Sequence, residues 1–214
     1  MDNQSWLTLL QQQQAIAVIR SSRQSLGLLM AKAVMAGGMS LIEITWNSDR
    51  VAELISQLRL ELPSCLIGTG TLLSQVQLQQ AIEAGAQFLF TPHVDTALIA
   101  AAVEAGIPII PGALSPTEIV TAWQAGASCV KVFPIEAVGG ANYIKSLQGP
   151  LGQIPLIPTG GVTLENAKEF ITAGAVAVGL SGELFPKSLV VAEDWEAIAQ
   201  RAKTLRQNLG IVHT

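Results

Sequence analysis

The chain has 214 residues, of which 50% are hydrophobic, 13% charged and 5% aromatic, and its formal net charge is −4. This length suits one domain with a substantial core, and the charged fraction is well below the roughly 25% usual in globular proteins. The weakly acidic balance, without a basic cluster in the sequence, excludes nucleic acid and an anionic membrane as expected partners.

Eight short apolar runs follow one another along the chain, and each is predicted to form a strand. Their near-continuous hydrophobicity is typical of parallel strands that are covered on both faces. An additional helix over Ser5–Gln14 is expected before the first of them. The runs are Ala15–Ile19, Leu41–Thr45, Leu66–Thr69, Phe88–Thr91, Ile107–Ile110, Val130–Phe133, Leu156–Pro158 and Val176–Gly179.

Amphipathic segments between these runs are predicted to be helices, for example Asp95–Ala105 and Ser115–Ala125. An Ala-Gly pair closes five such segments, and glycine is the residue expected just beyond a helix C-terminus. The segment Ser115-Pro116-Thr117-Glu118 predicts a capping box with proline in the first turn. A similar start is predicted at Thr163-Leu164-Glu165-Asn166.

Eight strands alternating with helices predict a single-domain (β/α)₈ TIM barrel over residues 1–214, with the extra N-terminal helix in front. An open, doubly wound parallel sheet is the alternative. That fold, in its dinucleotide-binding form, needs a Gly-x-Gly-x-x-Gly turn after the first strand, and the sequence has none there.

The first residues lack the basic start and apolar run of a signal peptide, and no apolar stretch approaches the roughly 20 residues of a membrane span. Cys65 and Cys129 form neither a disulfide framework nor a metal-ligand pair, and the only histidines are His93 and His213. We therefore predict a cytoplasmic protein without a bound metal or cofactor.

Three charged residues fall on the apolar runs rather than on helices or loops. Arg20 ends the first run, Glu43 lies within the second and Lys131 within the sixth. Burying an unpaired charge is costly, so these groups must pair or meet a ligand. Glu43 and Lys131 lie toward the carboxyl ends of their strands, where barrel active sites are built. Burial favours a neutral amine, which can attack a carbonyl group. A purely structural Glu43–Lys131 salt bridge is the alternative.

Glycine-rich turns follow the last two strands, at Thr159-Gly160-Gly161 and at Leu180-Ser181-Gly182. In this architecture the turns after strands seven and eight are the usual phosphate site. We therefore expect Gly160, Gly161 and Ser181 to bind phosphate. Gly68-Thr69-Gly70-Thr71 after the third strand either holds a small carboxylate or is only a tight loop, and His93 is expected to be a bystander at the rim.

These motifs together resemble the 2-keto-3-deoxy-6-phosphogluconate (KDPG) aldolase family. That family also includes the aldolases of 4-hydroxy-2-oxoglutarate (KHG) and of 2-keto-3-deoxy-6-phosphogalactonate (KDPGal). The resemblance runs from about Ala15 to about Leu184. It is carried by Ala36-Gly37-Gly38, Ile42-Glu43-Ile44-Thr45, Gly68-Thr69-Gly70-Thr71-Leu72, Pro111-Gly112, Val130-Lys131-Val132-Phe133-Pro134 and Pro158-Thr159-Gly160-Gly161-Val162.

The resemblance implies a metal-free class I aldolase that is usually a homotrimer, with a small keto acid as its substrate. Lys131 matches the Schiff-base lysine, and Glu43 matches the general acid/base. Further matches assign Arg20 and Thr71 to the substrate carboxylate and Thr159 to the reactive carbonyl, with Asn47 and Phe133 as other expected substrate contacts.

One position departs from the pattern of many phosphogluconate aldolases, which carry arginine two residues after the strand-two threonine. Here that residue is Asn47, and Asn47-Ser48 looks more like the phosphogalactonate branch. The expected activity is cleavage of KDPG, and of 4-hydroxy-2-oxoglutarate, with KDPGal as the alternative substrate. More remote alternatives are a sugar-phosphate isomerase or synthase and a non-catalytic barrel that binds a phosphorylated metabolite.

Overall fold

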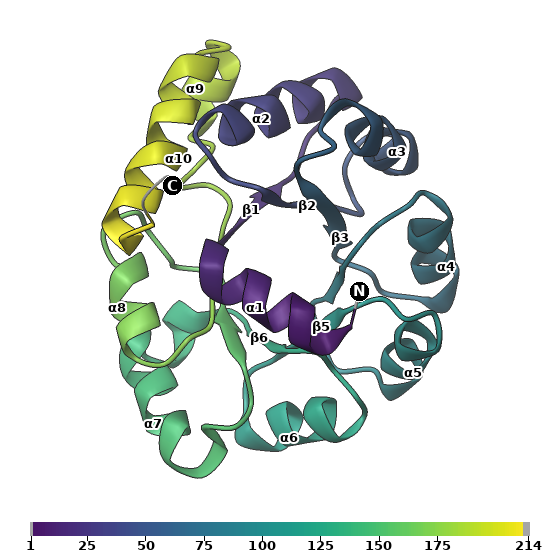
Figure 1. Ribbon diagram of the computed structural model, residues 1–214, viewed down its shortest axis with the longest axis vertical. Helices are drawn as coiled ribbons and strands as arrows, with labels where there is room; N and C mark the ends of the chain where they lie inside the picture. Colours follow the sequence, from purple (N-terminus) through teal and green to yellow (C-terminus); the bar gives the residue numbers. More distant parts are fainter. Residues whose placement is uncertain (1, 212–214) are drawn as a thin grey trace.

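The computed structural model describes residues 2–211 as a ring of parallel strands surrounded by helices (Figure 1). The strands are hydrogen-bonded in the order β7-β6-β5-β4-β3-β2-β1-β8, and a parallel bridge between Thr159 and Gly179 joins the two ends of this sheet. The predicted (β/α)₈ barrel is thus confirmed. His213 lies outside the described residues.

The strands begin and end close to the predicted apolar runs, and three of the eight have the same bounds. They are β1 (Ala15–Ile19), β2 (Leu41–Thr45), β3 (Leu66–Gly70), β4 (Leu89–Thr91), β5 (Ile109–Ala113), β6 (Val130–Val132), β7 (Leu156–Pro158) and β8 (Val178–Leu180).

The fifth and eighth strands begin later than the predicted runs, at Ile109 and Val178. Strand β5 extends through Pro111 and Gly112, which pair with Thr91 and Lys131 on the neighbouring strands. Position 112 requires glycine because a Cβ there would lie 2.6 Å from the Pro92 carbonyl group. Two residues that favour turns therefore lie inside this buried strand.

Ten α-helices and one short 3₁₀ helix accompany the strands of residues 2–211. They are α1 (Asn3–Gln13), α2 (Gln24–Ala36), α3 (Val51–Glu61), α4 (Gln75–Glu83), α5 (Thr96–Glu104), α6 (Pro116–Gln124), η1 (Ile135–Val138), α7 (Ala141–Leu151), α8 (Ala167–Thr172), α9 (Lys187–Val191) and α10 (Trp195–Leu209).

The predicted caps explain several helix starts. Asp95 caps α5, and Ser115 and Glu118 form the complete capping box of α6. The helix predicted to open at Thr163 begins at Ala167 instead. Its reciprocal bonds are nevertheless present, because Thr163 N donates to Asn166 Oδ1 and Asn166 N donates to Thr163 Oγ1. These bonds fix the turn that leads from β7 into α8.

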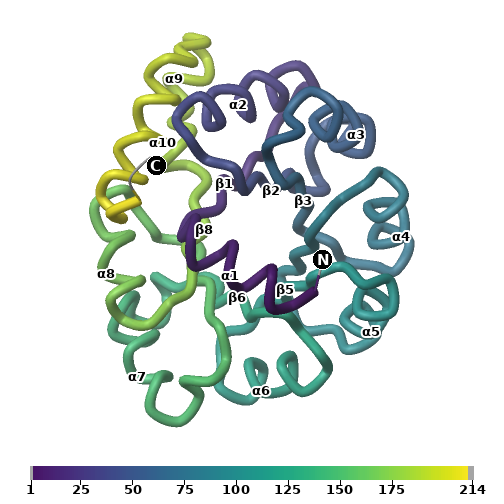
Figure 2. The backbone as a smooth tube through the Cα atoms, viewed as in Figure 1, coloured from purple at the N-terminus to yellow at the C-terminus, as the bar shows by residue number. Residues whose placement is uncertain are grey.

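The core has two parts, one between the strands and the helices and one inside the barrel. Helix α1 crosses one mouth of the barrel (Figure 2), and its Trp6 and Leu10 are fully buried there. Trp6 packs against Phe88, with the two rings tilted by 32° and their centroids 5.1 Å apart. The amino ends of the strands are thereby closed with apolar side chains, which leaves the carboxyl ends as the open mouth. None of the helices within residues 2–211 is long and apolar enough to cross a membrane.

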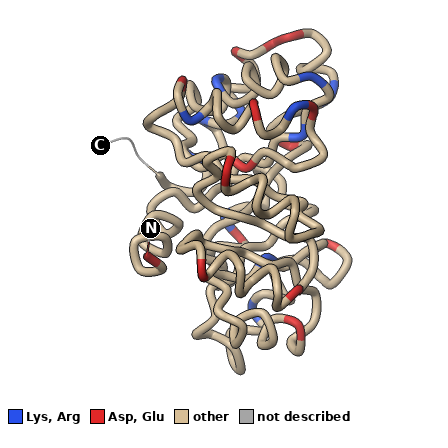
Figure 3. The backbone as a smooth tube through the Cα atoms, turned by 90° about the vertical axis from the view of Figure 1, so that its right-hand side faces the viewer, with Lys and Arg blue, Asp and Glu red and all other residues tan. Residues whose placement is uncertain are grey.

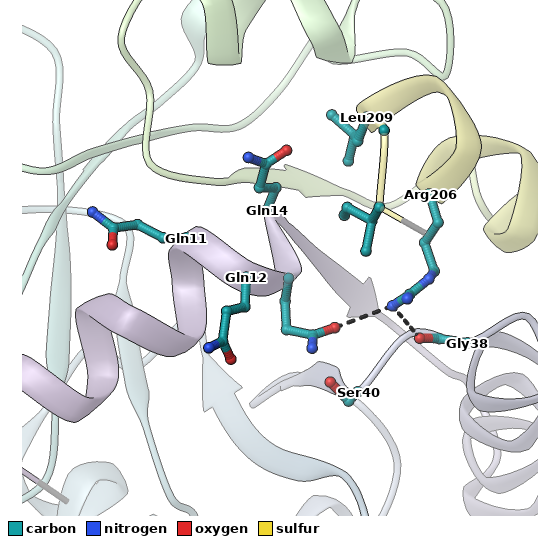
Figure 4. A pocket seen from close by; sticks show the side chains of 10 residues that line it. Gln11, Gln12, Gln14, Gly38, Ser40, Arg206 and Leu209 are labelled. Carbon is teal, nitrogen blue, oxygen red and sulfur yellow. Dashed lines mark hydrogen bonds between the residues drawn. The ribbon is translucent and has the colours of Figure 1, made fainter. Parts of the chain in front are cut away.

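Arg206 of α10 forms hydrogen bonds with two other segments at the closed end of the barrel (Figure 4). Its Nη1 donates to the Gly38 carbonyl oxygen and to Gln13 Oε1, the latter over 3.1 Å. Burial lowers the pKa of this guanidinium. A hollow of about 760 Å³ lies beside it, lined mainly by glutamines of α1 and by the end of α10. Because the Nη1 hydrogen bonds connect α10 with α1 and with the turn after α2, we interpret Arg206 as a structural residue.

Substituting Arg206 by leucine is expected to reduce the free energy of unfolding by about 1.5–3 kcal/mol, the range for a hydrogen bond to a charged group. Urea unfolding measures this loss. The matched control is Lys203→Leu on the same helix, exposed and expected to change stability by no more than about 0.5 kcal/mol. Equal losses in the two variants would contradict the structural role of Arg206.

Candidate active site

A cavity of about 760 Å³ opens at the carboxyl ends of the strands. Nine of the ten residues singled out from the sequence line it, although they come from six different strands or the turns that follow them. They are Arg20, Glu43, Thr71, Lys131, Phe133, Thr159, Gly160, Gly161 and Ser181. Asn47 is the exception: it is exposed in the turn after β2 and is not part of the lining.

Glu43 is a buried carboxylate in the interior of the barrel, only 2% exposed. It pairs in register with Gly68 of β3, and its Oε1 lies where a Cβ of Gly70 would be. Glycine at position 70 is what allows this close approach. Burial raises the pKa of Glu43 above its ordinary value, and the charges of Lys131 and Arg20 partly offset that rise. A carboxyl group in this environment is suited to exchanging protons with a substrate.

Lys131 lies on β6 between Gly112 of β5 and Ile157 of β7, and it is 8% exposed. Its Nζ is 4.7 Å from the centroid of the Phe133 ring and 5.7 Å from that of Phe90. Among the ion pairs within residues 2–211, none joins Lys131 to Glu43 within 4.0 Å. The amine is thus held by aromatic faces beside the cavity and not locked against a carboxylate.

Cys129 immediately precedes β6, two residues before Lys131, and is completely buried. Burial raises the pKa of its thiol to about 12. A thiol that stays protonated at neutral pH is a poor nucleophile. Cys129 is therefore a packing residue, and Lys131 is the nucleophile candidate on this strand.

Two threonines frame the cavity from opposite sides. Thr71 has a φ of 63°, a left-handed conformation that costs a non-glycine residue about 1–3 kcal/mol and is common at functional sites. Thr159 rests on Gly179, where a Cβ would be only 2.6 Å from the threonine hydroxyl. Both side chains are half-buried and line the cavity with Lys131. Their hydroxyl groups can donate to carboxylate or carbonyl oxygens of a ligand.

The glycine turns after β7 and β8 form one rim of the cavity. Gly160 and Gly161 have φ values of 83° and 97°, which only glycine adopts without strain. Within residues 2–211, the backbone N–H groups of Gly161, Val162, Gly182 and Glu183 have no hydrogen-bond acceptor. Free backbone N–H groups at such turns are suited to binding an anion.

Two acidic residues of this rim were not anticipated from the sequence. Glu136 of η1 follows Phe133-Pro134 and touches Gly161, and Glu183 follows Ser181-Gly182. Glu183 pairs with Arg201 over 3.3 Å, whereas Glu136 has no ion-pair partner among the described residues. Both residues lie next to predicted site motifs in the sequence, which is the one signal that could have indicated them. Loop residues follow no periodic pattern, so the sequence does not predict which way their side chains point.

His93 is exposed and is absent from the cavity lining, although its neighbour Pro92 contributes to it. The part of the chain that the structure describes contains no group of three or more His, Cys, Asp or Glu residues placed to hold a metal ion. A barrel with a buried amine, a buried carboxyl group and open glycine turns around one cavity is typical of enzymes that act on small anionic carbonyl compounds.

Comparison with known proteins identifies the family to which this chain belongs. The family model described as KDPG and KHG aldolase matches residues 7–201. The 2-dehydro-3-deoxy-phosphogluconate aldolase of Treponema pallidum is 32% identical over 203 residues, covering 95% of this chain and 97% of that protein. The chain belongs to the KDPG and KHG aldolase family. It is a metal-independent lyase of the Schiff-base class.

Solved structures agree with this assignment. The KDPG aldolase of Legionella pneumophila, with pyruvate captured as a covalent carbinolamine intermediate, has a TM-score of 0.87 at 26% identity and covers 96% of this chain and 98% of its own. A native KDPGal structure has a TM-score of 0.83 at 32% identity, covering 91% and 93% respectively.

Proposed function

We propose that this chain cleaves KDPG, and also 4-hydroxy-2-oxoglutarate, into pyruvate and an aldehyde through a Schiff base on Lys131. The aldehyde is glyceraldehyde 3-phosphate from the first substrate and glyoxylate from the second. The observation that carries the proposal is the placement of the Lys131 amine at the cavity, free of an ion pair and beside the buried Glu43. The carbinolamine of pyruvate in the Legionella relative supports the same chemistry.

In the proposed mechanism, the Lys131 amine attacks C2 of the keto acid, and loss of water leaves an iminium. Glu43 then removes the proton of the 4-hydroxyl group, directly or through water. The C3–C4 bond breaks, its electron pair enters the iminium to form an enamine, and the aldehyde leaves. Protonation of the enamine at C3 and hydrolysis of the resulting iminium release pyruvate and restore the amine. No metal or cofactor is required.

The other lining residues hold the two ends of the substrate in this proposal. Arg20 and Thr71 bind the carboxylate next to the keto group, and Thr159 contacts the carbonyl oxygen. Phe133 packs over the amine and the bound carbon chain. The phosphate lies at the rim, where Gly160, Gly161 and Ser181 surround open backbone N–H groups.

KDPGal is the alternative substrate, favoured by the Asn47-Ser48 segment and by the similarity to the KDPGal structure. The two sugar acids differ in the configuration at C4, the carbon whose hydroxyl faces Glu43. Measuring kcat/KM for KDPG, KDPGal and 4-hydroxy-2-oxoglutarate with one preparation decides between them. A higher value for KDPGal than for KDPG would replace the substrate assignment and leave the Schiff base in place.

Trapping with borohydride tests the central claim. The protein is incubated with pyruvate near neutral pH, reduced with borohydride and analysed by mass spectrometry after digestion. The expected result is one pyruvate adduct on the peptide that contains Lys131. Intact protein without any adduct would favour the isomerase or ligand-binding alternatives, in which Lys131 acts only as a charge.

We also propose that the single catalytic domain works as a homotrimer in the cytoplasm. Its buried, free cysteines suit a reducing compartment. Three large apolar side chains are strongly exposed on one side of the barrel, Leu60 on α3, Leu73 in the β3–α4 loop and Val76 on α4, at 83%, 57% and 67%. Leu73 and Val76 lie close together at the start of α4, and large apolar side chains exposed to this extent are typical of subunit interfaces.

Light scattering coupled to size-exclusion chromatography tests the trimer. Val76→Asp is expected to shift the mass of the particle from three chains to one, because it would bury a charge at the interface. The matched control is Val191→Asp on α9, 75% exposed on another side of the barrel (Figure 1). A monomeric parent, or a trimer that both variants leave intact, would contradict this interface.

A further inference from the structure

A second cavity of about 490 Å³ adjoins the active site on the β1 and β8 side. Two residues, Arg20 and Ser181, line both cavities, so the two spaces meet at the rim. The second cavity lies between the start of α2 and the helix α9. Its charged lining consists of Arg20, Arg23, Lys187 and Glu193, and the rest is largely apolar.

Most lysines and arginines lie on this side of the molecule, interspersed with acidic residues. All but two of the twelve lysines and arginines lie before residue 60 or after residue 167, the exceptions being Lys131 and Lys145. Figure 3 shows that Lys and Arg gather over one half of the barrel. Arg23 and Lys187 are exposed, and in residues 2–211 neither has an acidic partner within 4.0 Å. Both therefore remain available to an external anion.

The catalytic cavity itself offers little positive charge for a phosphate. Its charged lining contains three carboxylates, Glu43, Glu136 and Glu183, against the two cations Arg20 and Lys131. Glu136 lies directly against Gly161, in the rim where backbone N–H groups would receive an anion. A phosphate at the glycine turns would meet backbone N–H donors beside the Glu136 carboxylate, and Arg23 and Lys187 of the adjoining cavity can supply positive charge that offsets this carboxylate.

We propose that Arg23 and Lys187 extend the substrate site and select for a phosphate at the end of the substrate remote from the keto group. This inference rests on the proposed aldolase function. It adds two specificity-determining side chains beyond the glycine turns.

Steady-state kinetics with two substrates test this proposal. For Arg23→Gln and Lys187→Gln, kcat/KM for KDPG is expected to fall about tenfold each, and about 30- to 100-fold in the double variant, mainly through KM. For 4-hydroxy-2-oxoglutarate, which lacks a phosphate and is shorter, kcat/KM should stay within about twofold. Arg23→Lys should recover most of the loss. The matched control is Lys203→Gln, an exposed cation on α10 that lines neither cavity.

Binding of 3-phosphoglycerate, measured by calorimetry, separates this proposal from the catalytic one. Its dissociation constant should rise about tenfold in each variant and should rise with added salt more in the parent than in the double variant. Calorimetry gives this result even for a protein that fails to trap pyruvate. Equal losses for both substrates, or unchanged kcat/KM for KDPG in the double variant, would overturn the assignment of Arg23 and Lys187.

Discussion

Replacing Lys131 by methionine is expected to abolish both pyruvate trapping and aldol cleavage while leaving the barrel folded. Methionine keeps the length and apolar character of the stem, so the contacts with Phe90 and Phe133 persist. Without the amine no iminium forms, and the electrons of the C3–C4 bond have no acceptor. The loss of kcat should approach the order of 10⁶ seen when a covalent nucleophile is removed.

The matched control for that variant is Lys145→Met, an exposed lysine on α7 outside the cavity. It should trap pyruvate and turn over substrate as the parent does. Circular dichroism and urea unfolding show whether Lys131→Met is folded. Removing a buried charge from an apolar strand should leave its stability equal to the parent or slightly higher. A folded Lys131→Met variant that still yields a borohydride-stable adduct would move the Schiff base to another lysine.

Burial pattern explains which parts of the barrel were predictable from the sequence. Strands β1 and β7 are apolar from end to end, and β2 is apolar except for Glu43 and Thr45, so their bounds agree with the predicted runs. Strand β5 contains Pro111 and Gly112, which local preference assigns to a turn. Only the neighbouring backbone at Pro92, distant in sequence order from Gly112, makes glycine necessary there. Tertiary contact therefore overrode local propensity.

The candidate site also contains residues that the sequence predicts and residues that only the structure reveals. Glu43 and Lys131 are predictable because burying a charge on an apolar strand costs free energy unless the charge is paired or meets a ligand. The fold brings both residues to one cavity. Asn47 was included by position in a motif, and its exposed turn leaves it outside the lining. Glu136, Arg23 and Lys187 lie in loops or at helix starts. No periodic pattern there predicts which direction a side chain takes, so their grouping required the structure.

Substituting Glu43 by glutamine is expected to separate Schiff-base formation from bond cleavage. The amine of Lys131 is untouched, so borohydride should still trap pyruvate. Glutamine cannot take up the proton of the 4-hydroxyl group, and kcat for cleavage should fall by about 10²–10⁴, the usual contribution of general acid–base catalysis. Retention of full cleavage activity would remove Glu43 from its proposed role.

The pH dependence of activity gives a second readout. Burial raises the pKa of Glu43, and cleavage requires its ionised form as the base. The cleavage rate of the parent should therefore increase as the pH passes upward through that pKa. This limb of the pH profile should be missing in Glu43→Gln. A profile that is the same in both proteins would assign the limb to another group.

Stability should change with pH in a direction that the burial of Glu43 fixes. A carboxyl group whose pKa is higher in the folded protein than the unfolded value near 4.5 contributes stability that is fully present below that value. The contribution is lost as the pH rises through the folded pKa, because the folded protein then holds a desolvated charge. Glutamine mimics the protonated form and avoids that loss.

Relative to the parent, Glu43→Gln should gain free energy of unfolding as the pH rises above about 4.5, and the gain should level off once Glu43 is ionised in the parent. Urea unfolding at several pH values measures this gain, and Glu104→Gln on the exposed face of α5 is the control, expected to stay within about 0.5 kcal/mol of the parent. A gain that shrinks with rising pH would mean that Lys131 and Arg20 outweigh the burial of this carboxylate.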